Sequence, residues 1–139
     1  MSLSMRNQLP GTVTSVTPGD AMALVHVRLD GGGQLTSAIT RDAVEDLRLK
    51  EGTAVRALVK STEVSLATGP VEGLSIRNRL PGTVSRITQG AAMVSVRVGV
   101  EGGELTAAIT SDAATDLGLA EGTHVTALIK STEVALATA

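Results

Sequence analysis

The chain has 139 residues, a formal net charge of −2, and neither cysteine nor aromatic residues. The lack of cysteine excludes disulfides, thiolate zinc sites and cysteine nucleophiles. Without aromatic rings there is no stacking platform for single-stranded nucleic acid, and the slightly acidic balance offers no phosphate-backbone footprint. No apolar run approaches the roughly 18 residues of a membrane span, and the first residues lack a signal-peptide pattern. We therefore expect a cytoplasmic protein without nucleic-acid or membrane partners.

The first half of the chain is predicted to consist mostly of strands. The stretch AMALVHVRL alternates apolar and polar side chains with the period of a half-buried strand. Clusters of glycine, proline and aspartate separate the apolar stretches and mark turns. The predicted strands occupy, in chain order, residues 9–17, 21–29, 34–39, 54–60 and 63–67.

One short helix is predicted between the third and fourth strands, over residues 41–47. Thr40 has the side chain of an N-cap, and acidic residues occupy the first turns that follow it. Five strands with a helix after the third are typical of a small OB-like barrel. A five-stranded meander is the alternative arrangement.

The second half of the chain repeats the first. Ser4–Thr68 aligns with Ser75–Thr138, and about 40 of the 64 aligned positions are identical. The offset is 71 residues up to the glycine run and 70 after it, because Gly33 has no counterpart. We therefore predict an all-β fold of two tandem OB-like five-stranded barrels, each with one short helix. Residues 1–68 form the first domain, 69–73 a Gly/Pro linker, and 74–139 the second domain.

Each copy has about 65 residues, and a unit of that size buries only a thin core. Disulfides are excluded, and the sequence has no metal-binding motif that could staple the unit instead. The remaining source of stability is association, first between the two copies and then between chains. We therefore expect a homo-oligomer.

No enzyme motif is present in the sequence. Phosphate-binding loops, dinucleotide fingerprints, zinc-protease motifs and nucleophile elbows are all missing. The two histidines, His26 and His124, correspond to Arg97 and Ala54 in the other copy, so neither belongs to the repeated pattern. The carboxylates that recur lie where helix-terminus charges normally lie. We therefore predict that the protein is not an enzyme.

Only two basic positions recur in both copies, Arg6 with Arg77 and Lys60 with Lys130. Each is flanked by small polar residues, and antiparallel closure or a neighbouring subunit could bring the two positions together. Arginine offers a planar fork of donors, lysine a compact charge, and hydroxyls and a helix N-terminus add neutral donors. This set suits a small dianionic oxyanion. The alternative is that Arg6 and Lys60 form ordinary surface ion pairs with Glu63 or Asp42.

The repeated blocks also resemble a known family. SMRNQLPGTV at residues 4–13 resembles the SARN-x-L-x-G-x-V opening of the molbindin (Mop) family, and KSTEV at residues 60–64 resembles its closing segment. Both blocks occur twice, so the similarity covers essentially the whole chain. One difference is that Met5 or Ile76 stands where the family has a small residue.

This resemblance implies a tandem di-Mop protein that binds molybdate or tungstate in the cytoplasm for storage or homeostasis. The metal would enter as its oxyanion, with no separate metal ion and no organic cofactor. Tandem forms of the family assemble as trimers, with anions at domain and subunit interfaces. The implied oxyanion-binding residues are Ser4, Arg6, Asn7, Thr40, Lys60 and Ser61 in the first copy, and Ser75, Arg77, Asn78, Thr110, Lys130 and Ser131 in the second. The asparagines are expected to play a supporting role.

Two other functions remain open from the sequence. A ligand-responsive regulatory or assembly module without a storage role would use the same oxyanion site. An OB-type nucleic-acid binder is the other, although the missing aromatics and the acidic balance argue against it.

Overall fold

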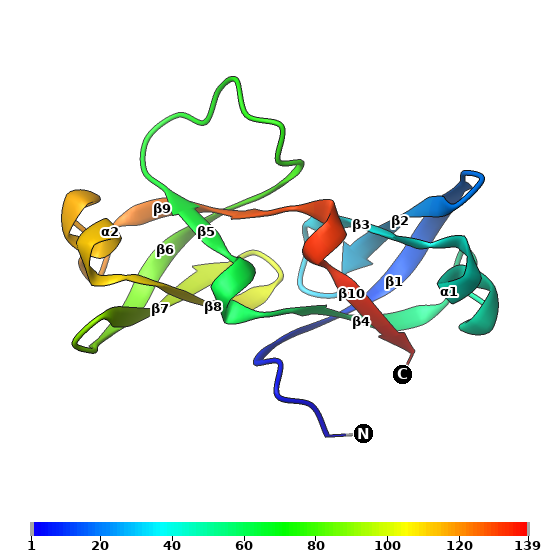
Figure 1. Ribbon diagram of the computed structural model, residues 1–139, viewed down its shortest axis with the longest axis horizontal. Coiled ribbons are helices and arrows are strands. Elements are labelled where there is room, and N and C mark those ends of the chain that lie inside the picture. Colours follow the sequence, from blue (N-terminus) through cyan, green and yellow to red (C-terminus); the bar gives the residue numbers. More distant parts are fainter. Residues whose placement is uncertain (1, 139) are drawn as a thin grey trace.

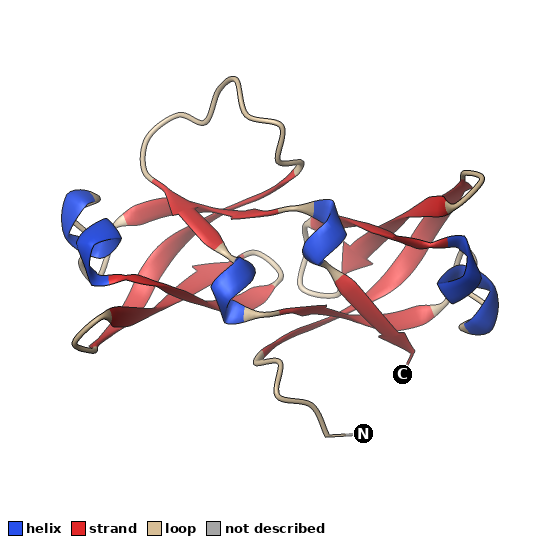
Figure 2. Cartoon of the chain, viewed as in Figure 1, coloured by secondary structure: helices blue, strands red, loops and turns tan. Residues whose placement is uncertain are grey.

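The computed structural model describes residues 2–138 and contains two antiparallel sheets of five strands each. The sheets lie end to end along the long axis of the molecule, each curled around its inner face (Figure 1). Strands make up most of the chain, and the few helices are short (Figure 2). None of the helices in this part of the chain is long and apolar enough to cross a membrane.

The two halves of the chain have the same order of elements. The first half contains β1 (Asn7–Pro18), β2 (Met22–Leu29), β3 (Gln34–Thr40), α1 (Arg41–Asp46), β4 (Ala54–Val59), the 3₁₀ helix η1 (Ser61–Glu63) and β5 (Ser65–Ala67). The second half contains β6 (Asn78–Gln89), β7 (Met93–Val100), β8 (Gly103–Thr110), α2 (Ser111–Asp116), β9 (His124–Ile129), η2 (Ser131–Glu133) and β10 (Ala135–Thr138).

The predicted helix and its cap are confirmed. The Thr40 hydroxyl accepts a hydrogen bond from the backbone N–H of Ala43 at 3.1 Å, and Thr110 does the same for Ala113. Each cap satisfies one of the donors that the first turn of a helix leaves without a partner. The helices lie at the two far ends of the molecule (Figure 1).

The strand order identifies the OB-like arrangement. In the first sheet the order is β10-β4-β1-β2-β3, and in the second it is β5-β9-β6-β7-β8. A meander would place β4 beside β3, whereas β4 pairs with β1. The alternative of a five-stranded meander is therefore wrong, and the predicted class of two tandem OB-like units is confirmed.

Two features of the long first strands, β1 and β6, allow the sheets to curl. A register shift interrupts the ladder between Val13 and Ser15 in β1, and between Val84 and Arg86 in β6. Such bulges bend a strand and increase its twist. Gly82 adds a close approach, because a Cβ there would lie 2.4 Å from the carbonyl oxygen of Gly99. The curl lets one sheet enclose its own apolar face.

The fifth strands are exchanged between the halves. The sequence predicted that the strand over residues 63–67 closes the sheet of its own repeat, and this is wrong. β5 pairs with β9 of the second sheet, and β10 pairs with β4 of the first. The closing segments of the two copies are nearly identical, so either strand fits either sheet, and hydrophobic alternation specifies only which face is buried. Glu63, the first residue of the expected strand, is the last residue of η1, and the chain crosses to the other half through this short helix.

The exchange gives the two halves a shared core. One cluster of buried apolar residues combines Leu9 and Val59 from the first half with Leu80, Ile129 and Val134 from the second. A smaller cluster joins the second sheet to Ala114 of α2. Each repeat thus adds buried apolar residues to the thin core that the other could form alone. This agrees with the association between the two copies that the sequence predicts.

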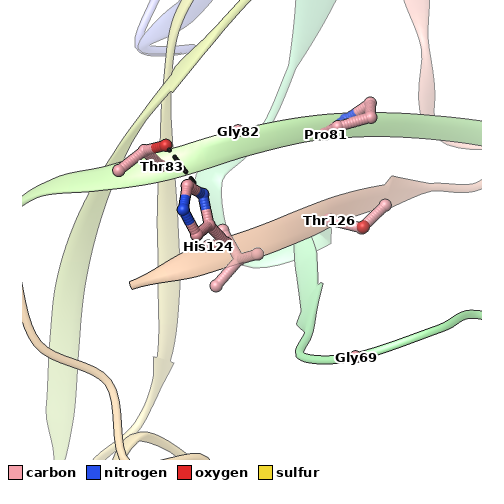
Figure 3. A pocket seen from close by; sticks show the side chains of 7 residues that line it. Gly69, Pro81, Gly82, Thr83, His124 and Thr126 are labelled. Atoms are coloured by element: carbon pink, nitrogen blue, oxygen red, sulfur yellow. Dashed lines mark hydrogen bonds between the residues drawn. The ribbon is translucent and has the colours of Figure 1, made fainter. Parts of the chain in front are cut away.

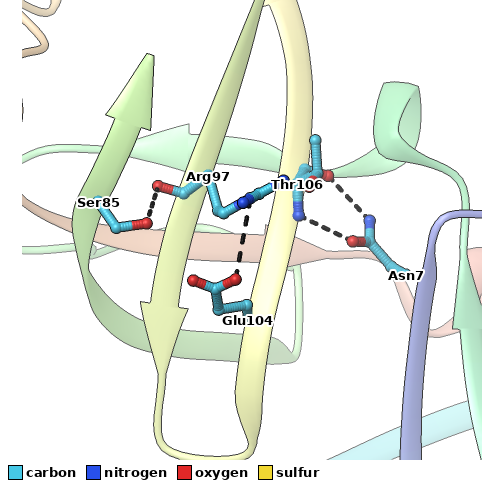
Figure 4. A network of polar contacts seen from close by, with 5 residues as sticks. All are labelled: Asn7, Ser85, Arg97, Glu104 and Thr106. Atoms are coloured by element: carbon cyan, nitrogen blue, oxygen red, sulfur yellow. Dashed lines mark hydrogen bonds and ion pairs between the residues drawn. The ribbon is translucent and has the colours of Figure 1, made fainter. Parts of the chain in front are cut away.

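Two buried asparagines fasten the halves together. The Asn7 side chain donates to the carbonyl oxygen of Thr106 and accepts from its backbone N–H, both at 2.8 Å (Figure 4). Asn78 makes the same pair of 2.8 Å bonds with the backbone of Thr36. Both asparagines are 3% exposed. Each amide therefore acts like one more strand residue laid against the outer strand of the opposite half.

Replacing either asparagine with alanine should destabilise the protein strongly. The Asn78→Ala variant leaves the N–H and C=O of Thr36 without partners, which should lower the free energy of unfolding by about 3 kcal/mol. Urea denaturation followed by circular dichroism measures the change. Gln89→Ala, which removes an exposed amide at the end of β6, should stay within about 0.5 kcal/mol of the parent protein. Equal stability of the two variants would contradict the fastening role.

The two halves should not behave as independent monomers. Residues 1–68 and 69–139, produced separately, each leave part of the shared core and one sheet edge uncovered, so we expect them to associate when mixed. Size-exclusion chromatography with light scattering should show a complex of the two fragments or strand-exchanged dimers. Two stable monomeric fragments that do not associate when mixed would contradict this expectation.

Candidate functional site

The recurring arginine and lysine come together at the end of one strand pair. Asn78 is opposite Ile129 in the ladder of β6 and β9, so Arg77 and Lys130 occupy the next positions along the two chains. They line one pocket of about 270 Å³, together with Ser75, Ile76, Ser131 and Thr132. Of the two ways in which the sequence could bring the basic positions together, antiparallel pairing within one chain is the one seen in the second copy.

The first half has the same strand register. Asn7 is opposite Val59 in the ladder of β1 and β4, which places Arg6 and Lys60 at the next positions. Ser4 lies two residues before Arg6, and Ser61 begins η1 directly after Lys60. The two copies thus arrange their predicted residues along the same pair of chain segments.

The pocket in the second half is positively charged and lacks a carboxylate partner. Among residues 2–138, the ion pairs within 4.0 Å are Arg41–Glu45 and Arg97–Glu104, and neither includes a basic residue of the recurring pairs. The alternative of surface pairs from Arg6 or Lys60 to Glu63 or Asp42 is therefore not found in that part of the chain. The two exposed cations are left to interact with solvent anions.

Neutral donors surround these two cations. Ser75 and Ser131 contribute hydroxyl groups, and Thr132 adds a third. Ser131 and Thr132 also begin η2, whose hydrogen bonds come from Glu133 and Val134, so their own N–H groups have no partner within the helix. A site rich in donors and free of carboxylates favours a fully deprotonated oxyanion, because an O–H on the ligand would need an acceptor.

The opposite half positions this pocket. Arg77 directly precedes Asn78, whose amide is bonded to the backbone of Thr36 on β3. The Ser37 hydroxyl, also on β3 and 0% exposed, donates to the carbonyl oxygen of Val134 at 2.6 Å, just after η2. Both segments of the pocket therefore rest on one strand of the first half. The buried amides of Asn7 and Asn78 are both engaged in this way, and each directly follows one of the recurring arginines.

Ser37 was not among the residues predicted to support the pocket. The sequence signal that could have found it is a hydroxyl residue at an inward position of a strand, between the apolar residues Leu35 and Ile39. Its counterpart, Ala107, has no side-chain donor, so the bond to the carbonyl oxygen of Val134 supports one half only.

The predicted threonines lie apart from the pocket that contains Arg77 and Lys130. Thr40 and Thr110 are exposed and cap α1 and α2. Their hydroxyl oxygens accept from the helix, and each hydroxyl proton remains available to donate. Met22 is opposite Thr40, and Met93 is opposite Thr110, with exposures of 46% and 44%. Each threonine is therefore beside an exposed apolar side chain.

Each histidine ring lies within hydrogen-bond distance of a threonine hydroxyl on the neighbouring strand. Nδ1 of His26 lies 3.2 Å from the Thr36 hydroxyl, and Nδ1 of His124 lies 3.4 Å from that of Thr83. His124 lines a pocket of about 480 Å³ beside the linker (Figure 3). The remaining lining residues carry no charge: Gly69, Pro81, Gly82, Thr83, Val125 and Thr126. This pocket offers a hydrogen-bonding imidazole and nothing that activates it.

Comparison with known proteins gives the same division into repeats. The TOBE domain model matches the chain twice, at residues 3–66 and 74–136. The chain is 43% identical over 136 residues to the molybdenum-pterin-binding protein MopB of Rhodobacter capsulatus, which covers 96% of this chain and 50% of that protein. It is 38% identical over 138 residues to the molybdenum transport protein ModE of Azotobacter vinelandii, covering 99% of this chain and 51% of that protein. The chain thus spans about half the length of these curated relatives.

A solved structure covers the whole chain. It is that of the cytoplasmic molybdate-binding protein ModG with molybdate bound, with a TM-score of 0.95, 37% identity and 100% coverage of both chains. The chain belongs to the TOBE domain family, with two copies of the domain in tandem. Within that family, the resemblance to the molbindins is confirmed, and the molecule is a tandem di-Mop protein.

Proposed function

We propose that this protein binds molybdate or tungstate in the cytoplasm, for storage or homeostasis. The observation that carries the proposal is the pocket in which Arg77 and Lys130 meet without a carboxylate. Together the two side chains balance the charge of a dianion, and the surrounding hydroxyls can bond its oxygens. The relatives named for molybdenum and the ModG structure support this choice of ligand.

We assign the binding residues in two equivalent sets. Ser4, Arg6, Lys60 and Ser61 serve the first copy, and Ser75, Arg77, Lys130 and Ser131 serve the second. Asn7 and Asn78 position the arginines from behind. Thr40 and Thr110 complete sites from another molecule, because they lie outside the pocket that contains Arg77 and Lys130 in the same chain.

A homotrimer is the assembly we propose for these shared sites. The exposed Met22 and Met93 support a subunit contact beside the two threonines, since apolar side chains next to a ligand site gain from being covered. An anion held between subunits would then be surrounded by donors and shielded from water, which strengthens each charged hydrogen bond.

A regulatory or assembly module is the second candidate. It is favoured by one observation, the match of this chain to about half the length of a molybdenum transport protein. Such a module would bind the same anion, and the bound anion would change its contact with another protein.

Removing one cation from a site should weaken molybdate binding. We expect Arg77→Ala or Lys130→Ala to cost about 2 kcal/mol at that site, or about thirtyfold in affinity, because a charge-assisted bond to the dianion is lost. Isothermal titration calorimetry with sodium molybdate measures the change. The same substitutions at Arg6 and Lys60 should act on the equivalent site.

The matched control is Arg28→Gly, which removes an exposed arginine and introduces the residue that the second repeat carries as Gly99. Its molybdate affinity should equal that of the parent protein. Unchanged affinity in the variants of Arg77, Lys130, Arg6 and Lys60 would overturn the assignment of the sites.

Native mass spectrometry tests ligand and assembly together. Anion-free protein titrated with molybdate should appear as a trimer that takes up several molybdates, whereas sulfate, with its shorter bonds, should bind more weakly. Molybdate should also raise the melting temperature by linkage, because it binds only the folded assembly. Equal uptake of sulfate at these sites would identify them as general anion sites, and an oligomer that takes up neither anion would contradict the proposed oxyanion binding.

A further inference from the structure

A second group of basic residues lies on the outer face of the second sheet. Arg86 of β6 and Arg97 of β7 are directly opposite each other in the ladder, and the next outward pair is Thr88 with Ser95. These four side chains line a pocket of about 240 Å³. Two arginines and two hydroxyls therefore meet at one place on the sheet, away from the pocket of Arg77 and Lys130.

The two arginines are only partly compensated. Like charges directly opposite each other destabilise an antiparallel pair. Glu104 of β8 approaches Arg97 at 3.8 Å, but the two side chains are 57% and 49% exposed, so the ion pair is weak (Figure 4). In the described part of the chain, no carboxylate lies within 4.0 Å of Arg86. The pocket consequently keeps a net positive charge.

The backbone holds these side chains in register. The β-bulge between Val84 and Arg86 sets Arg86 opposite Arg97. The hydroxyl of Ser85, the bulge residue, donates to the carbonyl oxygen of Arg97 at 3.2 Å. On its other side Arg97 pairs with Thr106, whose backbone is bonded to Asn7 (Figure 4). The strand that carries Arg97 is thus supported from both sides.

We propose that Arg86, Thr88, Ser95 and Arg97 bind one small tetrahedral oxyanion. Each guanidinium presents a planar fork of donors, and the two hydroxyls add donors from the neighbouring pair. The positive charge does not continue along the sheet, since the nearby outward residues include Glu104 and Gly99. An extended polyanion such as a nucleic acid would need such a track, and a single anion does not.

The site exists in the second repeat only. The corresponding residues of the first repeat are Ser15, Thr17, Leu24 and His26. It is therefore separate from the two equivalent molybdate sites, and it does not depend on the proposed function. Because Arg86 and Arg97 are both exposed and the pocket does not enclose the ligand, it should accept sulfate, phosphate and molybdate with similar affinity.

Nuclear magnetic resonance of the arginine Nε–Hε groups tests the proposal. Sodium sulfate is titrated into the full chain at constant ionic strength, with chloride as the replaced anion. The signals of Arg86 and Arg97 should move together and saturate with sulfate. In Arg86→Ser, which introduces the residue of the first repeat, the response of Arg97 should be at least about tenfold weaker.

Two further variants use the repeat as a guide. Glu104→Gln, the residue at the equivalent position of the first copy, removes the competing carboxylate and should tighten sulfate binding. The triple variant Ser15→Arg, Leu24→Ser, His26→Arg rebuilds the site in the first sheet and should give two new signals that respond to sulfate. A role of these arginines in stability alone would produce neither effect.

The double variant Arg77→Ala, Lys130→Ala separates this site from the proposed function. Its Arg86 and Arg97 signals should still respond to sulfate as in the parent protein, even if molybdate binding elsewhere is lost or was never present. The proposal is overturned if the two signals of the parent protein do not saturate with sulfate, or if the response of Arg97 is unchanged in both Arg86→Ser and Glu104→Gln.

Discussion

The structure depends on the reciprocal attachment of two halves that are individually too small to enclose a core. Each half supplies the closing strand of the other sheet, and each inserts one buried asparagine against the backbone of the other. The apolar residues of both halves then form one cluster. Removing either connection would expose backbone groups that have no other partner, which is why we regard the exchange as the main constraint on the fold.

The same attachment places the functional residues. Arg77 stands directly before Asn78, and Lys130 directly before η2, so the chain segments of the pocket are those that fasten to β3 of the first half. A rigid backbone holds two cations close together, where they would repel each other without an anion. In the site that we propose, this arrangement favours the binding of a dianion.

The two repeats have diverged in charge while they kept their fold. The positions of the proposed oxyanion site recur in both copies, whereas charged positions on the outer faces of the sheets differ, such as Arg86 and Arg97 against Ser15 and His26. Outward positions can change without loss of packing, so a duplicated domain can gain a second kind of anion site there. For each such residue, the aligned residue of the first repeat provides the substitution for a control variant.

The sequence by itself determined the local structure: the strands, the short capped helix and the repeat, with its recurring arginine and lysine positions. These follow from alternation, capping and turn chemistry, which act between neighbouring residues. Only the tertiary structure decided that the fifth strand crosses to the other sheet, that Asn78 binds Thr36, and that Arg86 lies opposite Arg97. The first two contacts join residues far apart in the chain, and the nearly identical closing segments of the repeats offer the same local pattern to either sheet. The third depends on the β-bulge that shifts the register of β6 against β7. The choice therefore depends on which arrangement buries the larger core.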